Sequence, residues 1–325
     1  MARGSSSLET EASPDRLLIL GGPRGPLREA IAARCPGLAV ETRHLDDADL
    51  GDALARADVV LGWTIPPDAA RRARRLQWIQ CLGAGVDRLL TIPELPERVV
   101  ITRVGRGFGP AMAEHVLGYL LALTLEVPRA LDQQRRRVWQ PYSAPLLRGR
   151  TAVVVGLGAI GGEVARLLRA AGLRVLGVNR SGLACPHADE TWPVAALDRL
   201  LPRAEIVVLV VPLTEATRHL LDARRLALLP RGAWLVNVGR GALVDESALV
   251  TALRAGRVGR AALDVFEVEP LPADSPLWAL DGVVVTPHVA GPDDVTHVSD
   301  VFAENYARFR AGQPLLYRVD RTRGY

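Results

Sequence analysis

A short apolar run that leads directly into three spaced glycines constrains the fold more than any other feature. Residues 151–155 are apolar apart from their first member, and Gly156, Gly158 and Gly161 follow with Gly-x-Gly-x-x-Gly spacing. Residues 163–171 then have the pattern of a helix. A strand, a glycine turn and a helix in this order are the context in which the motif binds a dinucleotide. The sequence therefore predicts a dinucleotide site at this turn.

The three glycines have different expected roles. The first permits a tight turn, the second lets a pyrophosphate approach the main chain, and the third allows the helix to pack closely on the strand. The pyrophosphate would lie on the exposed amides at the positive end of the helix. Because the motif lies near the middle of the chain, another unit must precede the cofactor unit.

Composition favours an ordinary soluble globular protein over a nucleic-acid-binding protein. A length of 325 residues favours two domains, and 49% hydrophobic with 23% charged residues is typical of soluble proteins. All 40 basic residues are arginine, which excludes Schiff-base chemistry on a lysine. Arginines cluster at 71–75 and 135–137 without interleaved aromatics, so we interpret these clusters as solvated helix faces.

The cysteines and the apolar segments indicate a cytoplasmic protein. Cys35, Cys81 and Cys185 are odd in number and far apart, which favours a reducing compartment and argues against a disulfide framework or a metal site. The first sixteen residues lack the apolar region of a signal peptide. Residues 116–127 form an apolar run that is short for a membrane span, so we expect a buried helix there.

Strand and helix patterns alternate along both halves of the chain, which predicts an α/β fold with two doubly wound parallel sheets. Residues 1–15 are expected to be a disordered tail. Asp245 is the expected N-cap of a helix over 246–255. Strands are expected at 16–20, 38–41, 59–63, 76–81, 99–102, 151–155, 174–179, 205–210, 233–237, 260–263 and 283–286. The other helices are expected at 27–34, 48–57, 68–74, 111–125, 163–171, 194–200, 224–228 and 293–310.

Polar residues follow three of the predicted strands, where parallel sheets bind their ligands. Arg240 lies between two glycines after one strand, and its planar charged fork suits a substrate carboxylate. Glu269 follows the next strand, and His288 follows the last. A histidine can exchange a proton near neutral pH, and a neighbouring acid favours its charged form. Taken singly, each residue is also compatible with an ordinary loop position.

Four motifs in order make the chain resemble the D-isomer-specific 2-hydroxyacid dehydrogenases over nearly its whole length. They are the glycine turn at 156–161, residues 229–245 with Asn237-x-Gly-Arg240-Gly, Asp264-Val-Phe-x-x-Glu269-Pro, and Pro287-His288. Residues 137–141 and the closing segment 319–325 are most similar to bacterial glyoxylate/hydroxypyruvate reductases.

The resemblance implies a catalytic role for each of the three polar residues. Arg240 would hold the carboxylate and carbonyl of a 2-oxo acid, and His288 would protonate the carbonyl oxygen as hydride arrives from the nicotinamide. Glu269 would pair with His288 and keep it protonated. The family's substrate loop corresponds to residues 82–87, where the amides of Ala84 and Gly85 would bind the carboxylate. Trp139 and Trp278 could wall the substrate site, although core or interface packing explains them equally well.

The cofactor site carried over from the family is larger than the glycine turn, and one part of it departs from an NAD pattern. An NAD site has an acid about twenty residues after the glycines, which bonds the ribose 2′-hydroxyl. Asn179, Arg180 and Ser181 stand there instead, and they suit a 2′-phosphate, so we expect NADP(H) to be preferred with NAD(H) possible. The remaining expected cofactor residues are Gly156, Gly158, Ala159, Ile160, Gly161, Val211, Pro212, Thr217, Val238, Gly239, Asp264, His288 and Gly291.

The resemblance also implies how the domains are arranged. A flavodoxin-like substrate domain is expected over 16–106 and 289–325, with an inserted Rossmann cofactor domain over 107–288. The active site would lie in the cleft between them, and the chain would form a homodimer through helix 111–125 and the arm 129–148. The predicted reaction is NADPH-dependent reduction of glyoxylate or hydroxypyruvate, without metal, nucleic acid or membrane. Alternatives are another 2-hydroxy acid, phosphoglycerate or phosphite as substrate, or a dinucleotide-sensing binding protein.

Overall fold

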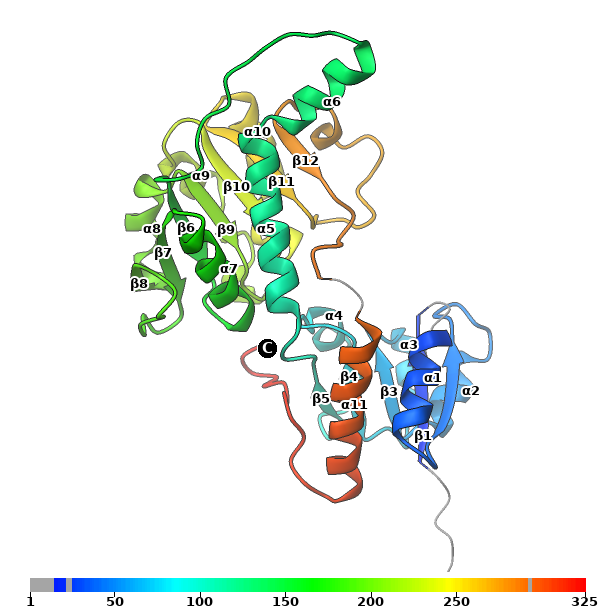
Figure 1. Cartoon of the computed structure of the whole chain (residues 1–325). Coiled ribbons are helices and arrows are strands. Elements are labelled where there is room, and N and C mark those ends of the chain that lie inside the picture. The colour runs from blue at the N-terminus through cyan, green and yellow to red at the C-terminus, as the bar shows by residue number, and fades with distance from the viewer. Residues whose placement is uncertain (1–14, 22–24, 292–293) are drawn as a thin grey trace, which may run out of the picture. The chain divides into compact units, whose positions relative to one another are not determined.

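The computed structural model describes residues 15–21, 25–291 and 294–325, which form two compact units (Figure 1). Unit 1 consists of Met1–Val104 and Asp294–Asp320, and unit 2 consists of Gly105–Asp293 and Arg321–Tyr325. The tail expected over 1–15 lies outside the described residues except for Asp15. Each unit has a parallel sheet with a hydrophobic core of its own.

Unit 1 contains a five-stranded parallel sheet with the order β2-β1-β3-β4-β5. This is the flavodoxin-like strand order, which confirms the fold expected for this unit. Its strands are β1 (Arg16–Leu20), β2 (Ala39–Arg43), β3 (Val59–Gly62), β4 (Trp78–Cys81) and β5 (Val100–Thr102). Its helices are α1 (Gly25–Arg34), α2 (Leu50–Arg56), α3 (Pro67–Ala70), α4 (Asp87–Leu90) and α11 (Val295–Arg310).

A buried polar and aromatic network joins α11 to this sheet, although the two are about 200 residues apart in the chain. The rings of Trp78 and Phe302 stack with centroids 5.1 Å apart. Asn305 donates through Nδ2 to Gln80 Oε1 at 3.2 Å, and Thr102 donates to the same oxygen at 2.8 Å. Buried polar groups need such partners, so the network specifies the packing of the C-terminal helix.

Unit 2 contains a seven-stranded parallel sheet with the order β12-β11-β10-β9-β6-β7-β8. Counted from β6, this is the doubly wound dinucleotide-binding order with one further strand, which confirms the expected Rossmann fold. Its strands are β6 (Thr151–Val155), β7 (Arg174–Asn179), β8 (Glu190–Pro193), β9 (Ile206–Leu209), β10 (Ala233–Asn237), β11 (Val258–Leu263) and β12 (Val283–Val285).

The helices of unit 2 include a long apolar one, α5 (Phe108–Thr124), which packs against α7 (Ala159–Ala170). Asp245 caps α10 by accepting a hydrogen bond from the Ala248 amide at 2.9 Å, as predicted. The other helices are α6 (Val127–Arg136), α8 (Leu197–Leu200), α9 (Ala223–Leu228) and α10 (Glu246–Arg254). None of the described helices is by itself long and apolar enough to cross a membrane, although α5 and α6, bent by 57°, satisfy these criteria as a pair.

Several element boundaries differ from the sequence-based expectation. Helix α7 begins at Ala159, inside the glycine motif, rather than at residue 163, and α5 begins before Pro110 because proline is tolerated in a first helical turn. Strand β8 was not expected. Glu190–Pro193 is short and half-buried, and its Glu190 pairs with Arg174 and Arg203. The pKa of Glu190 is lowered to about 2, first of all by the hydrogen bonds from Arg203.

The last five residues also differ from expectation. The sequence placed 289–325 as one segment of the substrate domain, whereas Arg321–Tyr325 belong to unit 2. Val319, two residues earlier, is still buried in the core of unit 1. The chain therefore connects the two units at three points, after residues 104, 293 and 320.

Candidate active site

Three neighbouring strands of unit 2 end in register, which brings their following loops to one edge of the sheet. Asn237 at the end of β10 pairs with Leu263 at the end of β11, and Leu263 pairs with Val285 at the end of β12. Arg240 and His288 each follow three residues after these strand ends. Because all the strands are parallel, this is the carboxyl edge, where doubly wound sheets bind ligands.

The loop that carries Arg240 is shaped by the side chain of Asn237. Asn237 accepts a hydrogen bond from the Gly239 amide at 3.1 Å and donates to the Arg240 carbonyl at 2.9 Å. A Cβ on Gly241 would lie 1.8 Å from the carbonyl carbon of Phe266, so only glycine fits. The loop of Arg240 therefore packs directly against the loop that leads to Glu269.

His288 and Glu269 form a hydrogen-bonded pair. His288 Nδ1 lies 2.9 Å from Glu269 Oε2, and the other carboxylate oxygen accepts a hydrogen bond from the Phe266 amide at 3.1 Å. The carboxylate is thus fixed on both sides, and the pair leaves Nε2 as the ring nitrogen for proton transfer. His288 has a φ of 55°, a left-handed conformation that costs free energy and is concentrated at functional sites.

Asp264 lies behind this pair and builds the turn that carries His288. Its side chain is 1% exposed, and its carboxylate accepts hydrogen bonds from the amides of Val289 and Ala290, both at 2.9 Å. Its main-chain carbonyl accepts from the His288 amide at 2.8 Å. Asp264 is one of the expected cofactor residues, and its carboxylate and its main-chain carbonyl both hold the histidine turn.

Two hydroxyl groups that sequence reasoning missed complete this cluster. Thr286 donates to Asp264 Oδ1, and the Tyr119 hydroxyl is hydrogen-bonded to Thr286. Burial of Tyr119 raises its pKa far above the ordinary range, so the hydroxyl stays protonated and can serve as a donor. Thr286 adjoins the Pro287-His288 motif and could have been found from it. Tyr119 had no such signal, because in α5 it resembles a core residue.

The glycine turn between β6 and α7 shows two kinds of glycine. Gly156 has a φ of 106°, and a Cβ on Gly161 would lie 1.6 Å from the Gly156 carbonyl oxygen, so the chain itself requires both. Gly158 has an unstrained φ of −75°, and a Cβ there would meet no atom within 4 Å. The open space in front of Gly158, at the N-terminus of a 12-residue helix, fits the approach of a pyrophosphate.

The turn after β7 presents the residues expected to bind a 2′-phosphate. Asn179 shapes this turn, since its Oδ1 accepts from the Gly182 amide at 2.6 Å and its Nδ2 donates to the Leu183 carbonyl at 2.8 Å. Arg180 is exposed and donates through Nη1 to the hydroxyl of Tyr325 at 3.0 Å. The next acid along the chain is Asp189. Its carboxylate accepts a hydrogen bond from the Val175 amide in β7 at 2.8 Å, so it stabilises that strand.

The other expected cofactor residues lie in loops that follow the strands or in the first turn of α7. In the loop after β9, Thr217 donates to the Pro212 carbonyl at 2.8 Å, which holds this loop together beside Val211. Val238 is buried, so its side chain contributes packing. The remaining members are exposed or half-buried: Ala159, Ile160, Ser181, Gly239 and Gly291.

In unit 1, Ala84 and Gly85 lie in the loop that follows β4, at the carboxyl edge of that sheet. Both are half-buried, and the Cys81 thiol donates to the Gly85 carbonyl at 3.2 Å. A Cβ on Gly83 would lie 2.1 Å from the ring of Trp63, so the loop packs closely on that ring. The packing on Trp63 and the hydrogen bond from Cys81 therefore hold this loop in place.

The two candidate tryptophans have different settings. Trp139 is 94% exposed, so its ring is almost uncovered by its own chain. Trp278 is 54% exposed and donates through Nε1 to the Pro272 carbonyl at 2.9 Å.

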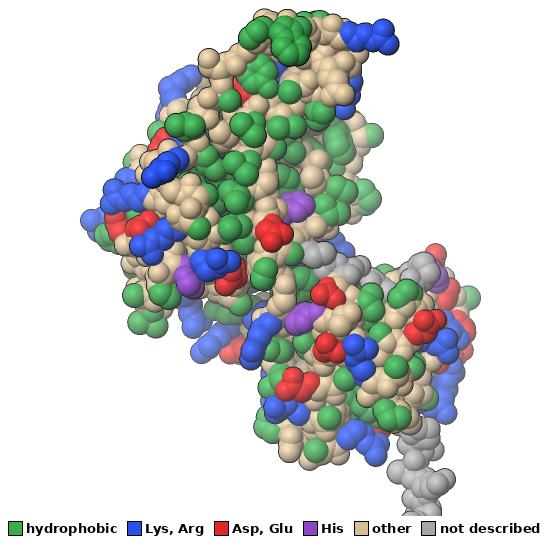
Figure 2. Space-filling view, viewed as in Figure 1, with side chains coloured by type: hydrophobic (Ala, Val, Ile, Leu, Met, Phe, Trp, Pro, Cys, Tyr) green, Lys and Arg blue, Asp and Glu red, His purple; other side chains and the backbone are tan. Residues whose placement is uncertain are grey.

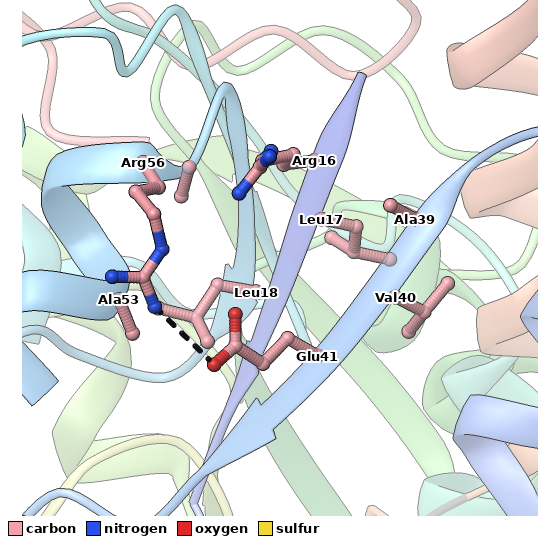
Figure 3. Close-up of a pocket in the computed structure, with 9 residues that line it drawn as sticks. Arg16, Leu17, Leu18, Ala39, Val40, Glu41, Ala53 and Arg56 are labelled. Carbon is pink, nitrogen blue, oxygen red and sulfur yellow. Dashed lines mark ion pairs between the residues drawn. The ribbon is translucent and has the colours of Figure 1, made fainter. Parts of the chain in front are cut away.

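A surface pocket in unit 1 has no relation to these residues (Figure 3). Its lining comes from β1, β2 and α2, and an ion pair of 3.7 Å between Glu41 and Arg56 crosses it. It lies where β1 and β2 begin, which is the opposite edge from the one that binds ligands in parallel sheets. Among residues 15–21, 25–291 and 294–325, no group of three or more His, Cys, Asp or Glu side chains is arranged to hold a metal.

Comparison with known sequences identifies a family for most of unit 2. Residues 117–290 match the family described as "D-isomer specific 2-hydroxyacid dehydrogenase, NAD binding domain". The D-3-phosphoglycerate dehydrogenase of Methanocaldococcus jannaschii is 33% identical over 252 residues, covering 75% of this chain and 48% of that protein. The chain thus spans about half the length of that relative.

Solved structures match the chain over nearly its whole length. A D-isomer specific 2-hydroxyacid dehydrogenase from Xanthobacter autotrophicus Py2, in complex with NADPH and MES, is 37% identical with a TM-score of 0.85, covering 97% of this chain and 100% of that one. An NADPH-dependent glyoxylate/hydroxypyruvate reductase from Sinorhizobium meliloti, in complex with NADP and sulfate, is 33% identical with a TM-score of 0.86, covering 96% and 100%.

Substitution of Gly158 should affect cofactor binding, whereas substitution of Gly161 should affect stability. Gly158→Val should weaken binding of a reduced nicotinamide dinucleotide by roughly tenfold or more, because the side chain fills the pyrophosphate approach. Its thermal unfolding midpoint should stay near wild type, since the new Cβ meets no protein atom. Fluorescence titration and thermal unfolding measure the two effects. As the control, Gly161→Ala should lower the unfolding midpoint, because its Cβ clashes with the Gly156 carbonyl oxygen. Undiminished binding in Gly158→Val would contradict the assignment.

Proposed function

We propose that this chain, which belongs to the D-isomer-specific 2-hydroxyacid dehydrogenase family, reduces glyoxylate or hydroxypyruvate to the D-2-hydroxy acid with NADPH. The family's enzymes are NAD(P)-dependent oxidoreductases that act on 2-hydroxy or 2-oxo acids. The observation that carries the proposal is the hydrogen-bonded pair of His288 and Glu269. The loops of this pair, the Arg240 loop and the glycine turn all follow strands of the same parallel sheet.

Arg240 is the proposed anchor of the substrate. A guanidinium binds a carboxylate through two parallel hydrogen bonds, and the same fork can reach the neighbouring carbonyl oxygen of a 2-oxo acid. The close packing of Gly241 on Phe266 fixes the backbone of the loop that carries Arg240. The amides of Ala84 and Gly85 are the proposed second holder of the carboxylate.

His288 is the proposed proton donor. The nicotinamide, when bound, supplies the hydride that adds to C2 of the substrate. His288 Nε2 gives its proton to the carbonyl oxygen in the same step, which turns the 2-oxo acid into a 2-hydroxy acid. Glu269 holds the imidazole through Nδ1, and its negative charge stabilises the imidazolium before transfer. Asp264 keeps the turn in place through the amides of Val289 and Ala290.

The turn at 179–181 supports NADPH as the preferred cofactor. An acid in this turn would repel a 2′-phosphate, whereas Arg180 offers charge-assisted hydrogen bonds to one. The solved structures from Xanthobacter autotrophicus Py2 and Sinorhizobium meliloti are complexes with NADPH and NADP, respectively. D-3-phosphoglycerate oxidation is the second candidate reaction, since one relative carries that name while being about twice as long.

A panel of 2-oxo acids assayed with both reduced cofactors tests substrate and cofactor together. We expect glyoxylate or hydroxypyruvate to give the highest kcat/KM in the panel. We also expect kcat/KM with NADPH to exceed that with NADH by roughly tenfold or more, because charge-assisted hydrogen bonds to the 2′-phosphate contribute about that much. Oxidation of D-3-phosphoglycerate in place of these reductions would support the second candidate. A clear advantage of NADH would overturn the proposed cofactor preference.

Substitutions separate the proposed roles of the two main site residues. His288→Ala should lower kcat by roughly 10²–10⁴-fold, because the carbonyl oxygen loses its proton donor. Arg240→Ala should raise KM and lower kcat, with a loss on the order of 10²-fold in kcat/KM. Steady-state kinetics measure both, and His44→Ala in unit 1 is the histidine control. If His288→Ala has turnover near wild type, His288 is not the proton donor.

We also propose that the chain forms a homodimer through α5, α6 and the arm at 129–148. Apolar side chains are exposed along this stretch, including Leu125 at 54% and Leu146 at 78%, in addition to Trp139. Figure 2 shows hydrophobic side chains on the face of unit 2 that carries these helices. Exposed apolar side chains gathered on one face are typical of an interface between subunits.

Light scattering after size-exclusion chromatography tests the dimer. The wild-type chain should have about twice its monomer mass of 35.0 kDa. Leu121→Arg combined with Leu125→Arg should shift the mass to that of a monomer, because two charges would be buried in the interface. Leu45→Arg, a partly exposed position in unit 1, is the matched control and should remain dimeric. A monomeric wild type would overturn this proposal.

A further inference from the structure

The C-terminal segment Arg321–Tyr325 lies on unit 2, next to two loops that follow strands of its sheet. The Tyr325 hydroxyl accepts a hydrogen bond from Arg180 Nη1 at 3.0 Å, in the turn after β7. A Cβ on Gly324 would lie 3.1 Å from Thr214 Cγ2, in the loop after β9. Strands β7 and β9 flank β6 on either side. The segment therefore contacts the loops of both strands that neighbour the one leading to the glycine turn.

This placement defines which part of a dinucleotide the segment would border. In a doubly wound sheet the first strand leads to the pyrophosphate, and the end of the second strand selects between a ribose 2′-hydroxyl and a 2′-phosphate. In this chain β6 is the first of these strands and β7 is the second. Tyr325 thus lies at the adenosine half of the proposed site, whereas the His288–Glu269 pair follows β11 and β12 on the other side of β6.

The contact with Tyr325 bears directly on how Arg180 can bind a phosphate. An exposed arginine has many rotamers, and binding an anion with it normally costs the entropy of selecting one of them. A hydrogen bond from one Nη to a tyrosine hydroxyl restricts the guanidinium before the ligand arrives. The guanidinium has five N–H donors in a planar fork, so one bond to Tyr325 still leaves donors for a phosphate.

We propose that Tyr325 is a positioning residue that orients Arg180 toward the 2′-phosphate and so strengthens selection of NADPH over NADH. The inference rests on the proposed cofactor preference and extends it to a segment nearly 150 residues further along the chain. A tail that merely packs against the site would affect both cofactors equally. A tail that blocks the site would weaken both, and its loss would tighten their binding.

The experiment removes the hydroxyl alone and measures binding of cofactor fragments. Tyr325→Phe, with any purification tag at the N-terminus, is titrated calorimetrically with adenosine 2′,5′-bisphosphate and with adenosine 5′-monophosphate, which lacks the 2′-phosphate. We expect Kd for the bisphosphate to rise roughly three- to tenfold, the effect of one hydrogen bond. Kd for the monophosphate should stay unchanged. Equal weakening of both, tighter binding of both, or no change in either would overturn the inference.

Two further variants attribute the effect to Arg180. Arg180→Ala should weaken bisphosphate binding by more than Tyr325→Phe does. Adding Tyr325→Phe to Arg180→Ala should have no further effect, because the tyrosine acts through the guanidinium. Tyr142→Phe is the matched control, since its hydroxyl bonds the Leu125 carbonyl elsewhere in unit 2. An additive double variant would overturn the positioning role.

The wild-type protein separates failure of this inference from failure of the proposed function. If wild type binds the bisphosphate no more tightly than the monophosphate, the cofactor preference itself is wrong, and the role of Tyr325 falls with it. If wild type prefers the bisphosphate and Tyr325→Phe keeps that preference in full, only the positioning role is wrong. The steady-state KM for NADPH and for NADH in Tyr325→Phe should follow the same pattern.

Discussion

The buried carboxylate of Asp264 is the interaction on which the candidate active site depends. An ionised carboxylate taken out of water is costly unless hydrogen-bond donors surround it, and the amides of Val289 and Ala290 supply them. These amides belong to the turn that holds His288 in its left-handed conformation, which by itself costs about 1 kcal/mol or more. The turn and the carboxylate therefore stabilise each other, and the imidazole is placed on a rigid base.

The parallel sheet of unit 2 converts this local cluster into a site. Because β10, β11 and β12 end in register, the loops of Arg240, Glu269 and His288 begin at the same edge. Gly241 packs closely on Phe266, so the Arg240 loop contacts the loop of Glu269. The hydrogen bond between His288 and Glu269 then joins that loop to the loop of His288. At the same carboxyl edge, beyond β9, the glycine turn after β6 leaves open space in front of Gly158, at the N-terminus of α7.

The strands that sequence patterns predict best are those whose side chains are buried on both faces. Four ranges, 16–20, 151–155, 174–179 and 233–237, coincide with β1, β6, β7 and β10. Patterns fail where tertiary contacts replace burial as the stabilising force. Strand β8 is short and only half-buried, and its Glu190 forms ion pairs with Arg174 and Arg203. Helix α6 has no buried side chain, and most of its residues were expected to belong to the arm at 129–148.

Sequence by itself determined the fold class, the glycine turn and the residues expected to act, because these depend on local patterns and on motifs that follow strand ends. Only the tertiary structure decided what Asp264 does, since its donors come from residues 25 and 26 positions further along the chain. It likewise decided that Tyr325 lies on Arg180, 145 residues away. Contacts between residues so far apart in sequence depend on how strands and loops are brought together, and no local pattern encodes that proximity.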